Sequence, residues 1–130
     1  VALAGPVTNL LLALAAVLLL PLTMLLPDAL ARWAQPMLQI MVFFNCIIAV
    51  FNMMPIPPLD GGRVAVAVLP RSLARELARL EPHGMLIVLG LFFLLPLVSA
   101  MAGSSFNPAA TLIFYPSQML ARSLLALVGL

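Results

Sequence analysis

The chain has 130 residues, of which 65% are hydrophobic and only 8% are charged, and its mean hydropathy is +1.22. Six arginines and four acidic residues give a net charge of +2, which is too small and too scattered to indicate nucleic-acid binding. A small soluble domain does not hide so much apolar surface from water, so the composition predicts an all-α, polytopic membrane protein with about four apolar helices.

The first membrane helix is predicted over Val7–Leu26. Twenty residues with a helical rise of about 1.5 Å each span roughly 30 Å, which is the thickness of a bilayer core. Pro6 lies at the first turn of this helix. The N–H groups of a first turn have no partner within the helix, so the N–H that proline lacks costs nothing there. One face carries small residues and one amide, a pattern that lets a second helix approach closely: Gly5, Asn9, Ala13 and Ala16.

A short polar turn is predicted over Asp28–Gln35, followed by a second membrane helix over Met37–Met54. Asn45 and Asn52 are seven residues apart and share one helical face. We expect that face to look into the helix bundle, because an unpaired amide in lipid is costly. Three prolines end this helix by removing backbone donors: Pro55, Pro57 and Pro58.

The second half of the chain is less regular. Arg63–Pro70 is a short apolar piece, and Arg71–Gly84 has arginines every fourth residue opposite leucines, which predicts an amphipathic helix at a membrane interface. A third membrane helix is predicted over Met85–Met101, with a proline inside it. Ala109–Leu130 is a last apolar stretch, interrupted by three residues: Pro116, Gln118 and Arg122.

The arginines predict the orientation of these helices. Four of the six lie between the second and third spans, so the Arg63–Arg79 loop is expected to be cytoplasmic in a bacterial-type inner or plasma membrane. In an antiparallel helix pair, the start of the first span and the end of the second lie at the same depth. Asn9 and Asp60 are therefore expected in one neighbourhood near the cytoplasmic side.

The stretch FNMMPIPPLDGGRV, residues 51–64, breaks the backbone next to one carboxylate, Asp60. Irregular backbone at membrane depth is tolerated only where protein buries it or a wet cavity adjoins it, and an acid there is a candidate functional residue. Asp60 fits a metal ligand, a proton carrier or a coupling-ion site. The alternative is an interfacial loop in which Asp60 is solvated or caps the next helix. His83 is expected to be a surface-loop residue rather than a ligand, and Glu76 and Glu81 are expected to balance the arginine face rather than to act as catalytic acids.

Two motifs resemble those of a known family. Asn52-Met-Met-Pro-Ile-Pro-Pro-Leu-Asp60-Gly-Gly62 is similar to the NxxPxPPLDGG element of the site-2 proteases, which are intramembrane zinc metalloproteases. Ala4-Gly-Pro-Val-Thr-Asn9 is similar to the AGPxxN element that opens the preceding membrane helix in that family. The two motifs cover roughly the first half of the chain, in the right order and one helical hairpin apart.

The resemblance implies that Asp60 is the third protein ligand of a catalytic zinc ion, with two histidines of an upstream HExxH sequence as the others. Three ligands leave one position for a water molecule, which zinc activates, and the glutamate of HExxH acts as general base. Asn9 and Asn52 would orient the substrate, stabilise the oxyanion or support the zinc ligands. The implied substrate is a transmembrane segment of a membrane-tethered protein.

These 130 residues contain no HExxH sequence. We therefore interpret the chain as a fragment whose upstream HExxH helix is missing, inactive alone, rather than as a degenerate relative. Residues 1–62 would form the catalytic hairpin, 63–84 an interfacial segment and 85–130 further membrane helices, all in one membrane domain. A non-catalytic pseudoprotease scaffold and a transporter element with a broken helix are the alternative functions.

Overall fold

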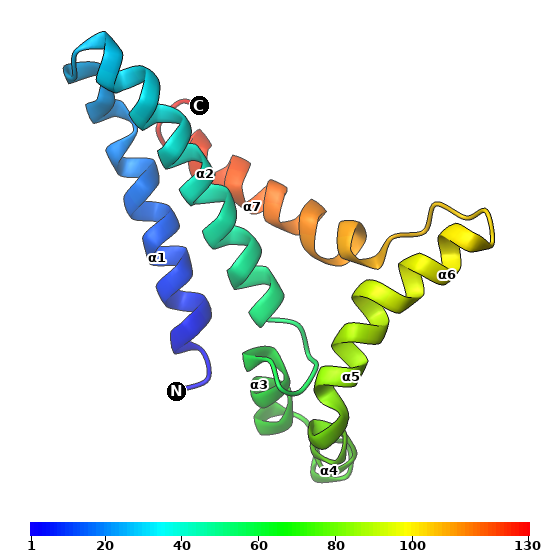
Figure 1. The fold of residues 1–130 in the computed structure, drawn as a ribbon. Coiled ribbons are helices and arrows are strands. Elements are labelled where there is room, and N and C mark those ends of the chain that lie inside the picture. Colours follow the sequence, from blue (N-terminus) through cyan, green and yellow to red (C-terminus); the bar gives the residue numbers. More distant parts are fainter.

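The computed structural model describes residues 1–130 and consists of helices joined by loops, without a strand (Figure 1). Helix α1 (Ala4–Leu19) continues into a 3-10 turn (Pro21–Leu25), and helix α2 (Asp28–Asn52) returns antiparallel beside it. The all-α prediction is confirmed. The first span begins three residues earlier than predicted, since Pro6 and the residues before it already belong to the helix.

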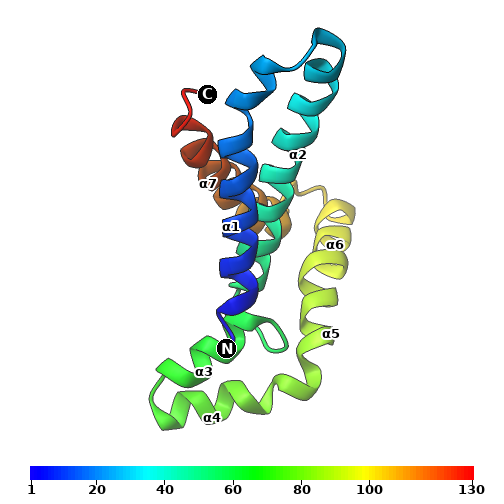
Figure 2. The ribbon, with the colours of Figure 1, turned by 90° about the vertical axis from the view of Figure 1, so that its left-hand side faces the viewer.

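The remaining helices lie at the lower end and along one side of this hairpin (Figures 1 and 2). In chain order they are α3 (Asp60–Val68), α4 (Arg71–Arg79), a 3-10 turn (Glu81–His83), α5 (Gly84–Leu89), a π-helical turn (Gly90–Leu94), α6 (Leu95–Met101), a second π-helical turn (Ala110–Phe114) and α7 (Tyr115–Ala126). The predicted amphipathic segment is thus helical over its first nine residues.

Three helical stretches are long and apolar enough to cross a membrane: Ala4–Leu25, Asp28–Asn52 and Arg71–Met101. The third stretch includes α4, which lies across the base of α5 rather than along its axis (Figure 2). The last apolar stretch, from Ala109, forms the second π-helical turn and α7 and is not among the three. The chain is therefore an α-helical membrane protein with three candidate spans and one shorter apolar helix.

The core lies between α1 and α2, where small residues of α1 meet the middle of α2. Ala13 and Ala16 are at most 1% exposed, and they pack with Val42 and Cys46 in one cluster. Small side chains allow two helix backbones to approach closely, which is the main source of packing energy between helices in lipid. The predicted small-residue stripe is confirmed at these two alanines.

The predicted polar turn over Asp28–Gln35 is wrong. These residues form the first two turns of α2, and the connection to α1 is reduced to Leu26 and Pro27. Asp28 sits in the first turn, where a negative charge favours the positive end of the helix. The Gln35 amide donates a hydrogen bond to Thr23 Oγ1 at 3.0 Å, which ties the new helix back to the end of the first span.

Helix α7 and the third span pack on the hairpin in different ways. Ala121 of α7 joins the core cluster between α1 and α2. The third span touches the end of α2 through an aromatic pair, in which the rings of Phe51 and Phe92 are 5.9 Å apart and tilted by 56°. Tilted aromatic contacts of this kind add stabilisation beyond the area they bury.

Each proline inside the last two long helices follows a π-helical turn. Pro96 and Pro116 each come two residues after such a turn, and the carbonyl four residues before each proline lies within it. A proline ring clashes with that carbonyl in a regular α-helix. The wider turn therefore lets the helix continue through the proline, so these prolines do not end the helices.

Ala16→Leu is predicted to destabilise the hairpin by roughly 1–3 kcal/mol, because the added methyl groups have no space between α1 and α2. Thermal or denaturant unfolding in detergent, followed by circular dichroism, measures the loss. Ala15→Leu is the matched control, since the neighbouring alanine is exposed and its variant should unfold like the wild type. Equal stability of both variants would contradict the close packing of the two helices.

Candidate functional site

The break between α2 and α3 is a compact loop of seven residues, Met53–Leu59. Its backbone closes on itself through short-range hydrogen bonds, with Ile56 N–H donating to Met54 O and Leu59 N–H donating to Ile56 O, both at 2.8 Å. Met54 and Pro57 are buried. Protein atoms and internal hydrogen bonds thus satisfy the irregular backbone that the prolines create.

Two glycines at the start of α3 let the loop fold back tightly. A Cβ atom on Gly61 would overlap the carbonyl groups of Met53 and Met54, and one on Gly62 would overlap the backbone of Ile56 and Pro57. Both glycines are buried. Only residues without a side chain fit there, so this glycine pair fixes the distance between α3 and the end of α2.

A third glycine joins the loop to the next membrane helix. Gly84, the first residue of α5, lies so close to the Pro57 carbonyl and the Pro58 ring that a Cβ atom has no room. The base of the third span is therefore in direct contact with the loop Met53–Leu59, which precedes Asp60 and is called the Asp60 loop below. Nothing in the local sequence of Gly84 marks its contact with Pro57, which lies twenty-seven residues earlier in the chain.

The carboxylate of Asp60 points at the first turn of α1. A Cβ atom built on Gly5 would lie 2.7 Å from Asp60 Oδ2, so the carboxylate occupies the space beside this glycine. Asp60 is half-buried, at the first position of α3. The expectation that the start of the first span and the acid share one neighbourhood is met at Gly5, one helical turn before Asn9.

Asn9 and Asn52 flank this neighbourhood from α1 and from the last residue of α2. Both are half-buried, and neither amide side chain has a hydrogen-bond partner within the chain. Asn45 differs, because its Nδ2 donates to the Met41 carbonyl at 2.8 Å within its own helix. Asn9 and Asn52 thus keep free donors and acceptors near the broken end of α2.

The charges around Asp60 leave its carboxylate available. Asp60 takes part in no ion pair, and the chain's one salt bridge, 2.9 Å long, joins Arg79 to Glu76 on α4. No group of three His, Cys, Asp or Glu side chains lies close enough to hold a metal ion. The site can offer one carboxylate ligand and needs further ligands from elsewhere to hold zinc.

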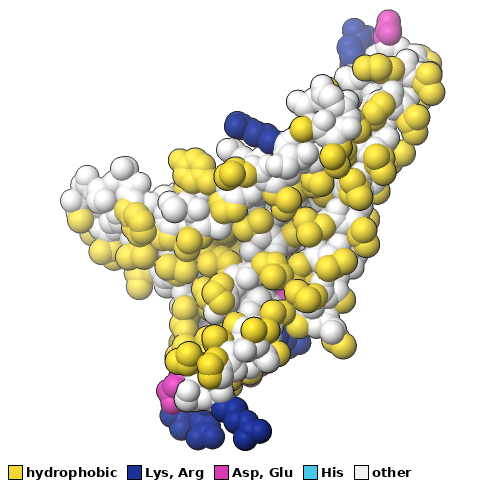
Figure 3. Space-filling model, turned by 180° about the vertical axis from the view of Figure 1, so that it is seen from behind, with side chains coloured by type: hydrophobic (Ala, Val, Ile, Leu, Met, Phe, Trp, Pro, Cys, Tyr) yellow, Lys and Arg dark blue, Asp and Glu magenta, His cyan; other side chains and the backbone are white.

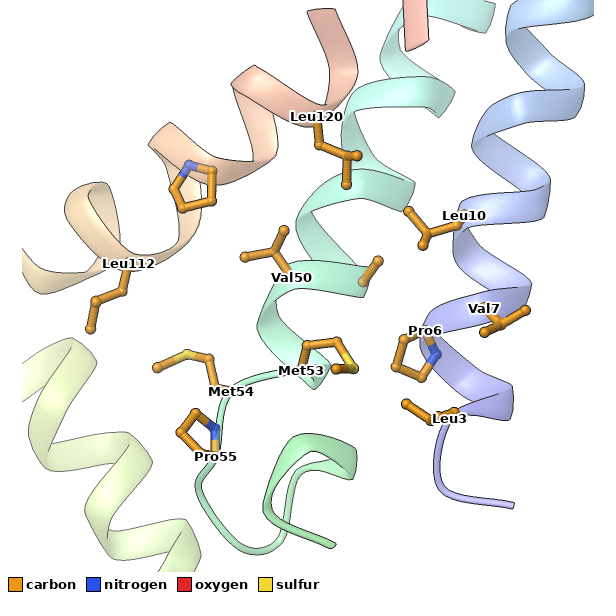
Figure 4. A pocket seen from close by; sticks show the side chains of 12 residues that line it. Leu3, Pro6, Val7, Leu10, Val50, Met53, Met54, Pro55, Leu112 and Leu120 are labelled. Carbon is orange, nitrogen blue, oxygen red and sulfur yellow. The ribbon is translucent and has the colours of Figure 1, made fainter. Parts of the chain in front are cut away.

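An apolar pocket of about 560 Å³ opens beside the same turn of α1 (Figure 4). Leu3, Pro6 and Val7 on either side of Gly5 form one wall, and the end of α2 with Met53 and Met54 forms another. Leu112 and the start of α7 close the third side (Figure 4). The sequence did not reveal this pocket, because its walls come from segments about one hundred residues apart in the chain.

The remaining candidate side chains lie on the surface, as expected. His83 is exposed in the 3-10 turn before α5. Glu76 is exposed and pairs with Arg79, and Glu81 is exposed at the start of the same 3-10 turn as His83. Glu81 lines a small cavity together with Pro57, Pro58 and Gly62, so it lies beside the loop that precedes Asp60.

Comparison with known proteins supports a family assignment. A family model described as "Peptidase family M50" matches residues 20–97, a range that includes Asn52 and Asp60 but not Asn9. The chain is 32% identical over 96 residues to "Putative zinc metalloprotease YwhC" of Bacillus subtilis (strain 168). That alignment covers 71% of the chain and 44% of the relative, so the chain spans less than half of the relative's length. No solved structure matches the chain significantly.

Cysteines placed at positions 5 and 60 are predicted to cross-link readily, because the Asp60 carboxylate fills the space beside Gly5. The pair Gly5→Cys with Asp60→Cys, in a Cys46→Ala background, should form a disulfide on mild oxidation in membranes. Gly129→Cys with Asp60→Cys is the control pair, since Gly129 lines a cavity with Leu20 and Pro21, at the opposite end of the hairpin from Asp60. Equal cross-linking of the two pairs would show that α3 does not stay against α1.

Proposed function

The chain belongs to peptidase family M50, the site-2 protease family, and we propose that it supplies part of the active site of an intramembrane zinc metalloprotease. The observation that carries this proposal is the Asp60 carboxylate, held at the broken end of a membrane-length helix pair and turned toward the first turn of α1. A loop that served only as a surface connection would not need three buried glycines to hold one acid in place.

The chemistry of Asp60 fits a zinc ligand. Its carboxylate is half-buried, at the end of a rigid loop, and has no arginine or lysine partner that would compete with a cation. When bound by three protein ligands, zinc polarises a peptide carbonyl and lowers the pKa of a bound water toward neutrality. Asp60 would contribute one of the three ligands, and its negative charge would offset part of the charge of the cation.

The other two ligands lie outside the residues that surround Asp60. In the family that the motifs resemble, they are the histidines of an HExxH sequence on an upstream helix, and these 130 residues hold a single histidine, His83. We assign that helix to a part of the protein that precedes this chain. This assignment agrees with the chain spanning 44% of the length of its Bacillus relative.

Asn9 and Asn52 are suited to holding a peptide backbone. Each side chain keeps a free amide donor and acceptor on a helix that borders the Asp60 loop. A peptide that is cleaved inside a membrane must first leave its helical conformation, which exposes its own N–H and C=O groups to a medium without water. The two amides would satisfy such groups and stabilise the charge that develops on the carbonyl oxygen.

The apolar pocket beside Gly5 supports a hydrophobic substrate. Nine of its twelve lining residues are hydrophobic, and its volume of about 560 Å³ has room for several aliphatic side chains. A transmembrane segment of a membrane-tethered protein has such side chains along its whole length. We place the cleavage site near the cytoplasmic side of the membrane, because the Asp60 loop lies at the same end as the arginine-bearing α4.

Asp60→Ala in the full-length protein is predicted to abolish cleavage of a membrane-bound reporter, because the zinc ion loses one of three protein ligands. Immunoblotting of the reporter in cells, together with the zinc content of the purified protein, measures both effects. Asp28→Asn is the matched control, since it removes the other aspartate, at the far end of the hairpin, and should leave cleavage unchanged. Full cleavage by the Asp60→Ala variant at normal expression would exclude Asp60 from the reaction.

Gly5→Ala is predicted to lower zinc affinity by about 10- to 100-fold, the range found when groups that orient a metal ligand are changed. The new methyl group would displace Asp60 Oδ2, and the carboxylate can turn away without disturbing the backbone. Zinc titration and unfolding of the purified full-length variant separate the two effects. Gly90→Ala is the control, because a Cβ atom there meets no other atom within 4 Å. An unaltered zinc affinity for Gly5→Ala would mean that Asp60 is not positioned by this turn.

A further inference from the structure

Helix α4 has two faces of opposite character. Its three arginines follow one another at intervals of four residues and therefore lie on one side of the helix: Arg71, Arg75 and Arg79. Leucines occupy the other side, at positions 73, 77 and 80. This is the pattern of a helix that lies in the plane of a membrane surface, with its leucines toward the acyl chains and its arginines toward the headgroups.

The rest of the chain covers α4 only in part: Ala74 and Leu77 are half-buried, and the other residues of the helix are exposed. None of its residues is buried, and the side chains of Leu73 and Leu80 are 55% and 43% exposed. The helix lies across the base of the third span, so its axis is turned away from that of α5 (Figure 2). An exposed leucine face at this end of a membrane protein is suited to contact with lipid.

The charges of this end favour an anionic surface. Residues 61–84 hold four arginines and two glutamates, which leaves a net charge of +2. Glu76 pairs with Arg79, while Arg71 and Arg75 are exposed and form no ion pair. Arg63 of α3 adds to the same end, since it lines a small cavity together with Ala78 and Glu81 of the α4 segment. Dark-blue side chains gather accordingly at the lower end of the molecule (Figure 3).

We infer that α4, together with Arg63, docks on the headgroups of anionic phospholipids at the surface of the membrane that the chain spans. Zwitterionic headgroups carry no net charge, so they attract the arginines much more weakly. Each arginine near an anionic surface strengthens association by roughly fivefold. This inference goes beyond the proposed function and does not depend on it.

Docking of α4 would also set the depth of the Asp60 loop. Leu80 and the 3-10 turn Glu81–His83 connect α4 to Gly84, and Gly84 rests on the carbonyl of Pro57. The helix on the headgroups and the loop that precedes Asp60 are thus linked through four residues and one backbone contact. A membrane without anionic lipid would hold the same loop less firmly.

Amide hydrogen exchange of the reconstituted chain tests the inference. In nanodiscs of phosphatidylcholine with about one third phosphatidylglycerol, exchange over residues 71–79 should be slower than in phosphatidylcholine alone. The double variant Arg71→Gln with Arg75→Gln should lose this protection. Each arginine contributes roughly fivefold to the association of α4 with the anionic surface, so the two changes together should weaken it by roughly twenty-five-fold. Arg32→Gln with Arg122→Gln removes the same charge elsewhere in the chain and should keep the protection.

Exchange over residues 71–79 that is the same in both lipids, whether fast or slow, would overturn the inference. Unchanged exchange over α1 and α2 shows that the variants are folded. Should the Arg71 and Arg75 variant unfold, the wild type in high salt decides, because salt screens headgroup attraction. Loss of the phosphatidylglycerol effect in high salt supports docking on charge, and its persistence contradicts it.

Discussion

The structure depends on how an interrupted backbone is accommodated at the end of a membrane helix. Water is scarce there, so each N–H and C=O group that leaves the helix must find a partner within the protein. The loop Met53–Leu59 meets part of this demand by hydrogen-bonding to itself, and it packs against three glycines that lack the side chains to block it. The position of the Asp60 carboxylate follows from this packing, because α3 begins where the loop ends.

The α1–α2 hairpin gives the loop a fixed surface to face. Ala13 and Ala16 let the two helices approach closely, and this brings the first turn of α1 to the depth at which α2 ends. Gly5 then leaves space for the carboxylate, while Asn9 and Asn52 stay free of internal partners at the same end. The glycine of the AGPxxN element thus gives room to the carboxylate, and we propose that its asparagine offers polar groups to a substrate.

Composition and motifs predicted the helical class, the hairpin and the neighbourhood of Asp60, because runs of apolar residues and helical periodicity are local properties. The turn over Asp28–Gln35 was predicted wrongly, since Arg32 and Gln35 are polar but are also good helix formers and prolong α2. The pocket beside Gly5 and the contact of Gly84 with Pro57 were beyond a reading of the sequence. Both join segments that are distant in the chain, and packing alone brings those segments together.

We propose above all that Asp60 is a ligand of a zinc ion whose other ligands come from a preceding helix. Anomalous X-ray diffraction from the full-length protein, recorded at the zinc edge, tests this claim most directly. We expect a single zinc peak at about 2.0–2.2 Å from a carboxylate oxygen of Asp60, with two histidines completing the protein ligands. A zinc peak ligated by other residues, with the Asp60 carboxylate turned to solvent, would contradict it.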